Sequence, residues 1–192
     1  MPPLILASTS LYRRALLQRL QLPFDCAVPG VDETSLAADS HLDRAVRLAL
    51  AKAAAVAARH PGTTVIGSDQ IGVCKGALLD KPGDALRAHA QLQWLSAAAA
   101  TFYTAVAVLQ LERGHSLQFV DTTTVYFRAL SDAEIDRYIA IERPFDCAGS
   151  FRCEGLGITL FSRVVSEDPT GLIGLPLIAV ARALRQLGYD LP

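Results

Sequence analysis

The sequence is short of several features that would assign it to a particular class of protein. Its 192 residues include four cysteines, Cys26, Cys74, Cys147 and Cys153, with no C-x-x-C pair. This spacing argues against a disulfide framework or a zinc site and favours reduced thiols in the cytoplasm. No apolar run reaches the roughly 18 residues of a membrane span. The N-terminal apolar run is short and has no basic region before it, so no signal peptide is expected.

Charge is also sparse and balanced. Charged residues make up 19% of the chain, and the formal net charge is −1. Because there is no basic run, broad electrostatic binding to nucleic acid or to an anionic membrane is not expected. Hydrophobic residues make up 51%, enough for one domain with a sizeable core. We therefore predict a single globular domain over residues 1–192.

Apolar periodicity and turn residues predict an α/β fold with a mixed sheet, because strands and helices alternate early and hairpins occupy the middle. A capping box at Ser131–Glu134 predicts a helix start, and Pro176 and Gly188 bracket the last helix. The other expected helices are about 11–20, 41–59 and 83–96; the expected strands are 4–7, 63–68, 101–111, 116–128 and 158–165, with an extended segment at 22–32 and a hairpin at 71–79.

The segment LILASTSLYRR, from Leu4 to Arg14, passes from apolar residues to hydroxyls and then to cations. It predicts a short buried strand that turns into a helix, with Ser8 and Ser10 near the helix N-terminus. Free backbone N–H groups and the positive end of the helix dipole suit such a turn to anions, phosphate above all. A plain N-cap beside a solvated arginine pair explains the two serines equally well.

Two carboxylates follow apolar segments. The expected strand VIGS runs straight into Asp69, at the position where ligands bind in open α/β sheets. Because burial of a lone charge is costly, we expect Asp69 to have an ion-pair partner, a bound metal or a catalytic role. The alternative is an Asp that caps a turn. Glu33 follows Asp32 after the extended segment, where a solvated loop is the alternative.

Two lysines complete a set of charged positions. Lys52 lies in an otherwise apolar, alanine-rich helix, and Lys81 precedes Pro82, which stiffens its backbone. Each alone is typical of a surface charge. Together with the acids they are what a nucleotide-hydrolysing site requires: carboxylates for a cation such as Mg²⁺, basic groups for phosphates, and a carboxylate that takes a proton from water.

A glycine-rich stretch, RPFDCAGSFRCEGLG, spans 143–157. Its three glycines and its proline predict a loop that passes close to another group. Glu154 stands between Cys153 and Gly155 and is not on an obvious solvated helix face. A plain glycine-rich connector is the alternative.

These residues resemble the Maf-like nucleoside triphosphate pyrophosphatases over essentially the whole chain. The resemblance implies an elongated mixed β-sheet flanked by helices with a central cleft, similar to the inosine-triphosphate pyrophosphatases. It also implies hydrolysis of a nucleoside triphosphate to the monophosphate and pyrophosphate with a divalent metal (Mg, Mn or Co). The motifs that carry it are Ser8-x-Ser10-x-x-Arg13, Val31-Asp32-Glu33, Gly67-Ser68-Asp69-Gln70, Asp80-Lys81-Pro82, Thr101-Phe102-Tyr103-Thr104, Cys147-Ala148-Gly149-Ser150 and Gly174-Leu175-Pro176.

The resemblance also implies residue roles. By motif position Asp69 is the proton acceptor, and Glu33 and Asp69 are the metal or metal-water ligands. The implied phosphate contacts are Ser8, Arg13, Lys52 and Lys81.

Three positions separate the branches of this family: Tyr12, Gln70 and Glu154. Gln70 together with Glu154 resembles the branch that hydrolyses 7-methyl-GTP. 7-Methylguanine is positively charged, so a stacked Tyr12 would gain roughly 0.5–2 kcal/mol from a cation–π contact, and Glu154 can accept hydrogen bonds from the base edge. Leu11 stands where Pro is common and Tyr12 where Trp is common, which predicts looser base selection.

Two alternatives remain open at this point. One is a pyrophosphatase of the same family that acts on dTTP or UTP. The other is a nucleotide-sensing regulator, linked to cell-division arrest, that needs no turnover. The expected partner is a small nucleoside triphosphate rather than nucleic acid or a membrane. Whether the chain forms a homodimer is open, because the apolar segment 101–108 suits either a core or a dimer face.

Overall fold

The computed structural model describes residues 1–34 and 38–192. These residues form a mixed seven-stranded sheet of order β2-β1-β3-β5-β6-β7, with β4 paired to β3, and five α-helices. The α/β fold with a mixed sheet is therefore confirmed. The strands are β1 Leu4–Ala7, β2 Phe24–Cys26, β3 Thr64–Cys74, β4 Ala77–Leu79, β5 Ala99–Gln110, β6 His115–Phe127 and β7 Phe161–Val165; the helices are α1 Leu11–Gln18, α2 His41–Ala57, α3 Ala85–Leu95, α4 Asp132–Glu142 and α5 Leu177–Gln186.

The chain packs as two compact units, each assembled from segments that are distant in sequence. The first contains 1–70, 103–121 and 168–192, and the second contains 71–102 and 122–167. Strands β3, β5 and β6 pass from one unit into the other, so the chain crosses between them within the sheet. The single domain over 1–192, the elongated shape and the central cleft stay predictions.

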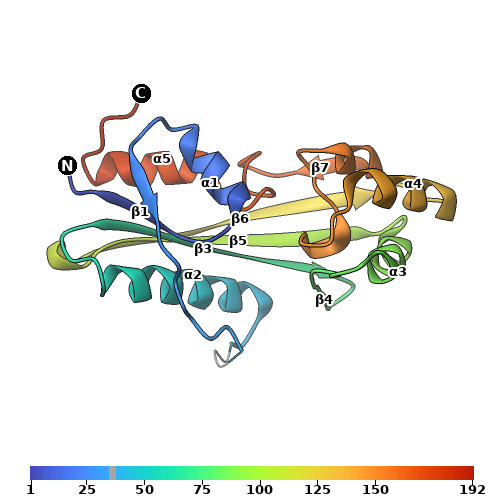
Figure 1. The fold of residues 1–192 in the computed structure, drawn as a ribbon, viewed down its shortest axis with the longest axis horizontal. Helices are drawn as coiled ribbons and strands as arrows, with labels where there is room; N and C mark the ends of the chain where they lie inside the picture. The colour runs from blue at the N-terminus through green and yellow to red at the C-terminus, as the bar shows by residue number, and fades with distance from the viewer. Residues whose placement is uncertain (35–37) are drawn as a thin grey trace. The chain divides into compact units, whose positions relative to one another are not determined.

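In the first unit, helices cover both faces of the parallel strands β1 and β3 (Figure 1). Leu4 and Leu6 of β1 point to the face that α1 and α5 cover, where Leu16, Leu17, Val180 and Leu184 are buried. Ile5 and Ala7 point to the other face and pack against Ala53 and Val56 of α2. Alternate residues of a strand face opposite sides, so β1 is buried on both sides and is apolar throughout.

Helix α2 lies unusually close to β3 because the strand has a glycine at the point of contact. A Cβ atom built on Gly67 would lie 2.3 Å from the carbonyl oxygen of Ala49 and 2.6 Å from the amide nitrogen of Ala53. The alanines at these helix positions also have the smallest side chain that a helix favours. This close approach determines where the neighbouring Lys52 lies relative to β3.

The second unit is built around aromatic side chains. Phe151 makes edge-to-face contacts with Phe102, Phe127 and Phe161, with ring centroids 5.0–5.6 Å apart, a favourable geometry for such pairs. Helices α3 and α4 pack together in this unit. Helix α4 begins with the predicted capping box, in which the Glu134 carboxylate accepts from the Ser131 backbone N–H at 2.9 Å.

The hairpin at 71–79 is confirmed, since β3 and β4 pair antiparallel around Lys75 and Gly76. The segment 101–108 is core rather than a surface face: Phe102, Thr104 and Val106 on β5 are at most 1% exposed. All four cysteines are free thiols. Within the described residues, none of the helices combines the length and apolar content needed to cross a membrane.

Three boundaries differ from the sequence prediction. Strand β3 does not end at Ser68 but continues through Asp69 and Gln70, because these polar side chains all find buried partners. The strand expected at 158–165 begins only at Phe161, since Ile158 donates back to the carbonyl of Gly155 at 3.4 Å and a 3₁₀ turn fills 156–160. The extended segment 22–32 contributes only the three residues of β2.

Candidate active site

The centre of the first unit is a lysine held between two carboxylates. Lys52 Nζ lies 2.6 Å from Asp69 Oδ1 and 2.7 Å from Glu33 Oε1. Lys52 and Asp69 are each 7% exposed, whereas the Glu33 side chain is 53% exposed. Asp69 is therefore a buried, paired acid rather than a turn cap, and Glu33 is tied to it through a shared ammonium group.

The position of Asp69 follows from the different lengths of β1 and β3. The last pair of the two parallel strands joins Ala7 to Gly67, and β3 continues beyond it. Asp69 lies two residues after Gly67 and thus on the same face, where α2 supplies Lys52. The prediction that Asp69 lies at the end of its own strand was wrong; it lies just past the end of the neighbouring strand.

Arg13 is the second cation of this cluster. Its Nε donates to the carbonyl of Gly174 at 2.9 Å. Burial lowers the pKa of Arg13, and the negative charges of Asp69 and Glu33 oppose that shift. Arg13 is thus electrostatically coupled to both acids, while direct contacts join Lys52, Asp69 and Glu33 from distant parts of the chain.

Burial also raises the pKa of Asp69 above its ordinary value of 3.8, and the charge of Glu33 adds to this effect. The charges of Lys52 and Arg13 oppose it without reversing it. A carboxylate with a raised pKa holds a proton more readily and is a better general base near neutral pH than an ordinary Asp.

The two serines of the β1–α1 turn are engaged in the turn itself. Ser10 caps α1 and accepts from the backbone N–H of Arg13 at 3.3 Å. Ser8 is 6% exposed and its hydroxyl accepts from the Ser10 N–H at 3.1 Å. The structural role is thus present for both serines, and phosphate binding by Ser8 stays a prediction.

Gln70 points to the opposite face of β3 from Asp69. Its Nε2 lies 2.9 Å from Thr104 Oγ1, 3.1 Å from the carbonyl of Gly171 and 3.0 Å from that of Leu172. These contacts give Gln70 a structural role beside the predicted role in base selection. Tyr12 is half-buried near the start of α1, whereas the fully buried residues of this helix are Leu16 and Leu17.

A loop for which the sequence reasoning gave only the motif Gly174-Leu175-Pro176, and no role, orients several of these groups. The carbonyl of Gly174 accepts from both Arg13 Nε and Ser68 Oγ, the latter at 3.0 Å. Asp168 is 4% exposed; its Oδ1 accepts from Thr170 Oγ1 at 2.7 Å and its Oδ2 from the N–H of Ile178 at 2.7 Å. Asp168 thereby closes the loop and caps α5. The sequence Asp-Pro-Thr-Gly at 168–171 was the available signal, because Asp, Pro and Gly favour tight turns.

The other two predicted residues, Lys81 and Glu154, belong to the second unit. Lys81 is exposed in a segment fixed at both ends. The N–H of Gly83 donates to the carbonyl of Phe145 at 3.0 Å, and that of Gly149 donates to the carbonyl of Asp80 at 3.4 Å. Two motifs that are far apart in sequence therefore support each other. Glu154 is exposed in the glycine-rich loop.

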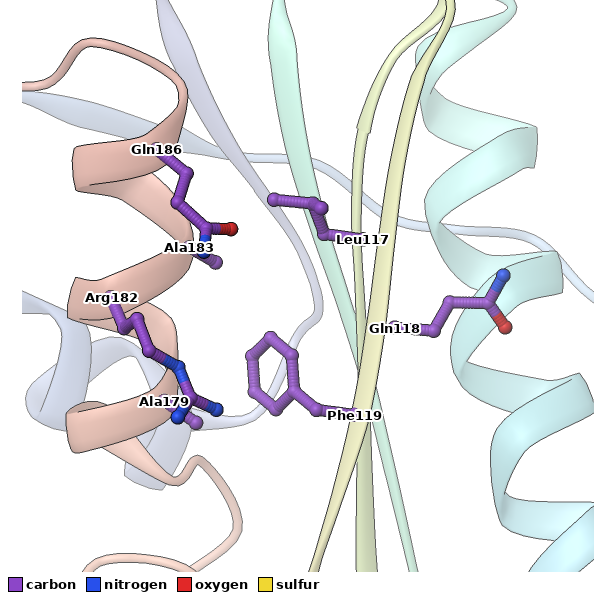
Figure 2. A pocket seen from close by; sticks show the side chains of 7 residues that line it. All are labelled: Leu117, Gln118, Phe119, Ala179, Arg182, Ala183 and Gln186. Atoms are coloured by element: carbon purple, nitrogen blue, oxygen red, sulfur yellow. The ribbon is translucent and has the colours of Figure 1, made fainter.

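A pocket lies elsewhere in the first unit, between β6 and α5. Figure 2 shows Leu117 and Phe119 pointing from the strand toward the helix, with Arg182 on the opposite wall. Its volume is about 310 Å³. None of the predicted site residues lines it, and its lining contains no carboxylate, so it is not the site assembled around Asp69.

The carboxylates of Glu33 and Asp69 offer hard oxygen donors, which suit Mg²⁺ or Mn²⁺. Mg²⁺ commonly takes one or two protein carboxylates and fills its other positions with substrate phosphates and water. The donor set therefore fits a divalent cation of this kind. Across residues 1–34 and 38–192 there is no group of three or more His, Cys, Asp or Glu side chains that could hold a metal ion.

Comparison with known proteins identifies the family. The Maf-like protein family model matches residues 3–187. The chain belongs to the Maf-like protein family. A protein named 7-methyl-GTP pyrophosphatase from Xanthomonas oryzae pv. oryzae (strain MAFF 311018) is 54% identical over 192 residues, covering 100% of both chains. A protein of the same name from Ralstonia nicotianae (strain ATCC BAA-1114 / GMI1000) is 50% identical over 190 residues, covering 99% of this chain and 98% of that protein.

A further relative of this Maf-like protein, from Aromatoleum aromaticum (strain DSM 19018 / LMG 30748 / EbN1), is also named 7-methyl-GTP pyrophosphatase. It is 52% identical over 189 residues, covering 98% of this chain and 97% of its own. Among solved structures, that of a HAM1 protein from Coxiella burnetii matches with a TM-score of 0.44 at 18% identity, covering 66% of this chain and 73% of that one.

Proposed function

We propose that this Maf-like protein is a cytoplasmic, divalent-metal-dependent pyrophosphatase that hydrolyses 7-methyl-GTP to 7-methyl-GMP and pyrophosphate. The choice of substrate is supported by full-length relatives at 50–54% identity that carry this activity in their names. The reaction is supported by one structural observation above all, the buried Asp69–Lys52 pair with Glu33 and Arg13 beside it.

Each group of the cluster has a distinct task in this proposal. Asp69, with its raised pKa, accepts the proton of the attacking water as the anhydride between the α- and β-phosphates breaks. Arg13 and Lys52 offset the charge that grows on the phosphates. A divalent cation held by Glu33 and Asp69 would add further positive charge at the phosphates. Burial keeps these charges poorly screened, which strengthens their effect.

Base selection is assigned to Tyr12, Gln70 and Glu154, and further phosphate contacts to Ser8 and Lys81. The methylated base is cationic, so an aromatic ring and a carboxylate each favour it over an unmethylated guanine. The exposed carboxylate of Glu154 is free of the burial cost that a charge would pay in a core.

The test is a substrate panel with pyrophosphate detection. The purified chain is incubated with 7-methyl-GTP, GTP, dTTP and UTP in the presence of Mg²⁺, Mn²⁺ or Co²⁺, with a chelator control. We expect 7-methyl-GTP to be hydrolysed fastest and the chelator to abolish turnover. Faster hydrolysis of dTTP or UTP would move the chain to the other branch of the family. Nucleotide binding without pyrophosphate release would favour a sensing role.

A further inference from the structure

Helix α4 ends in a buried carboxylate that binds two residues of the glycine-rich loop. Glu142 is the last residue of the helix, and its side chain is 6% exposed. Its Oε1 forms an ion pair with Arg152 Nη2. Its Oε2 accepts from the backbone N–H of Leu156 at 2.5 Å. One carboxylate therefore holds two residues on either side of Glu154.

A second side chain of the same helix supports this arrangement. Tyr138, one turn before Glu142, accepts through its hydroxyl from the backbone N–H of Arg152 at 3.0 Å. Within the loop, the N–H groups of Gly155 and Gly157 donate to the carbonyl of Arg152 at 3.2 Å and 3.1 Å. The loop is thus closed on itself and attached to α4 at both ends.

Gly155 shows how closely the loop is fitted to this carboxylate. A Cβ atom at Gly155 would lie 2.6 Å from Glu142 Oε2, inside any allowed contact. A larger residue here would have to displace the Glu142 carboxylate from Leu156 and Arg152, so the loop next to Glu154 is fitted to this side chain. The Glu154 carboxylate itself is exposed and accepts from the thiol of Cys153 at 3.5 Å.

We propose that Glu142 is a positioning residue for base selection, which fixes the loop 152–156 so that Glu154 is presented in one orientation. The inference rests on the proposed function, in which Glu154 recognises the methylated base. A selective contact requires its side chain to be held to within about 0.5 Å by supporting groups, and an exposed loop lacks such support unless something ties it down. The buried carboxylate of Glu142 provides this support through its contacts with Arg152 and Leu156.

The variant that tests this is Glu142→Gln. The amide keeps an acceptor for the Leu156 N–H but loses the charge that pairs with Arg152. We expect the ratio of kcat/KM for 7-methyl-GTP to that for GTP to fall, by up to about 10²-fold, the cost that a 1 Å misplacement of a group can have. The kcat for GTP should change little, because the ion pair and hydrogen bond described for Glu142 both lie within the second unit. An unchanged ratio would overturn the proposal.

Two comparisons separate positioning from a general structural effect. Glu134→Gln is the matched control, because Glu134 lies on the same helix and pairs with Arg128 at 2.7 Å; it should leave the ratio unchanged. In a Glu154→Gln background, Glu142→Gln should cause no further loss of selectivity. A further loss there would show that Glu142 acts independently of Glu154 and would contradict the proposal.

A measurement without turnover keeps the inference testable if the proposed function fails. Hydrogen exchange should become faster across 152–157 in Glu142→Gln and stay unchanged in the Glu134→Gln control. If the wild-type chain hydrolyses none of the panel while exchange changes as expected, the proposed function fails, but the attachment of the loop by Glu142 is confirmed. If exchange in the loop is unaffected, Glu142 does not fix the loop, and the proposal fails whatever the substrate. Should Glu142→Gln not fold, Tyr138→Phe removes one attachment alone and is read in the same way.

Discussion

The buried pair at the centre of the first unit allows one prediction to be worked in detail. Replacing Lys52 by Met keeps the length of the side chain and removes its charge. Glu33 is half exposed and can be solvated, but Asp69, 7% exposed, loses its ion-pair partner and keeps only the electrostatic effect of Arg13. Breaking a buried pair in this way typically costs about 3–5 kcal/mol in the free energy of unfolding.

The loss must depend on pH, and its sign follows from the pKa of Asp69. That pKa already lies above 3.8 in the folded chain, and it rises further in Lys52→Met because the charge of Lys52 had lowered it. A carboxyl whose pKa is raised by folding stabilises the fold fully when protonated, below its unfolded pKa. This contribution is lost as the pH rises through the folded pKa. The destabilisation should therefore be near its full size at pH 7 and clearly smaller at pH 4.

Urea unfolding followed by circular dichroism at several pH values measures this directly. The double variant Lys52→Met/Asp69→Asn should recover much of the lost stability, since no charge is then buried alone. Lys81→Met is the control: this lysine is exposed, and its loss should cost less than about 0.5 kcal/mol. A loss below about 1 kcal/mol at pH 7 for Lys52→Met, or an equal loss at pH 4, would refute the reasoning.

Three further predictions concern the same unit. Asp69→Asn should leave the fold intact and lower kcat for pyrophosphate release by about 10²–10⁴-fold; full activity in the variant would remove Asp69 from the mechanism. The kcat/KM of the wild type should fall as the pH drops through the pKa of Asp69, which lies above 3.8. Gly67→Ala places a Cβ 2.3 Å from the carbonyl of Ala49 and should cost about 1–3 kcal/mol together with activity, whereas an unchanged melting temperature would contradict the tight contact. Asp168→Asn weakens the cap at the N–H of Ile178 and should cost about 1 kcal/mol and raise KM for the triphosphate; a KM equal to that of the wild type would show that the loop does not orient Arg13.

Local patterns predicted most of the elements because short-range physics decides them. The apolar run Leu4–Ala7, the capping box at Ser131 and the turn at Lys75-Gly76 each appear at the expected residues. The misplaced boundaries have a different cause. Polar residues at 68–70 look like the end of a strand, but their partners Gly174, Lys52 and Thr104 come from distant parts of the chain, and no local pattern reveals them.

The candidate site, too, could be predicted from the sequence only in part. The charged residue types predicted one site of two acids, two lysines and an arginine. The structure joins Lys52 to Asp69 and Glu33 and couples Arg13 to both acids electrostatically, whereas Lys81 belongs to the second unit. Their supports could not be predicted, because a backbone carbonyl has no sequence signature. The acceptor for the guanidinium is such a carbonyl, and Glu142 at the end of α4 looks like any surface acid until the fold places the glycine-rich loop against it.

The contacts of Lys52 allow it to be both the ion-pair partner of the two acids and a phosphate contact. An ammonium group has three N–H donors, and among the described residues the distances to Asp69 and Glu33, 2.6 Å and 2.7 Å, account for two of them; the third can donate to a phosphate oxygen. The net charge of the cluster also bears on how a nucleotide binds. Two carboxylates and two cations, Lys52 and Arg13, sum to zero, so the cluster has no net attraction for a triphosphate. A divalent cation at the two carboxylates would change that sum to positive, and the nucleotide would in turn favour the cation, because coupling between two binding sites is reciprocal. The charge balance thus supplies its own reason, separate from any relative, for nucleotide and metal to bind together.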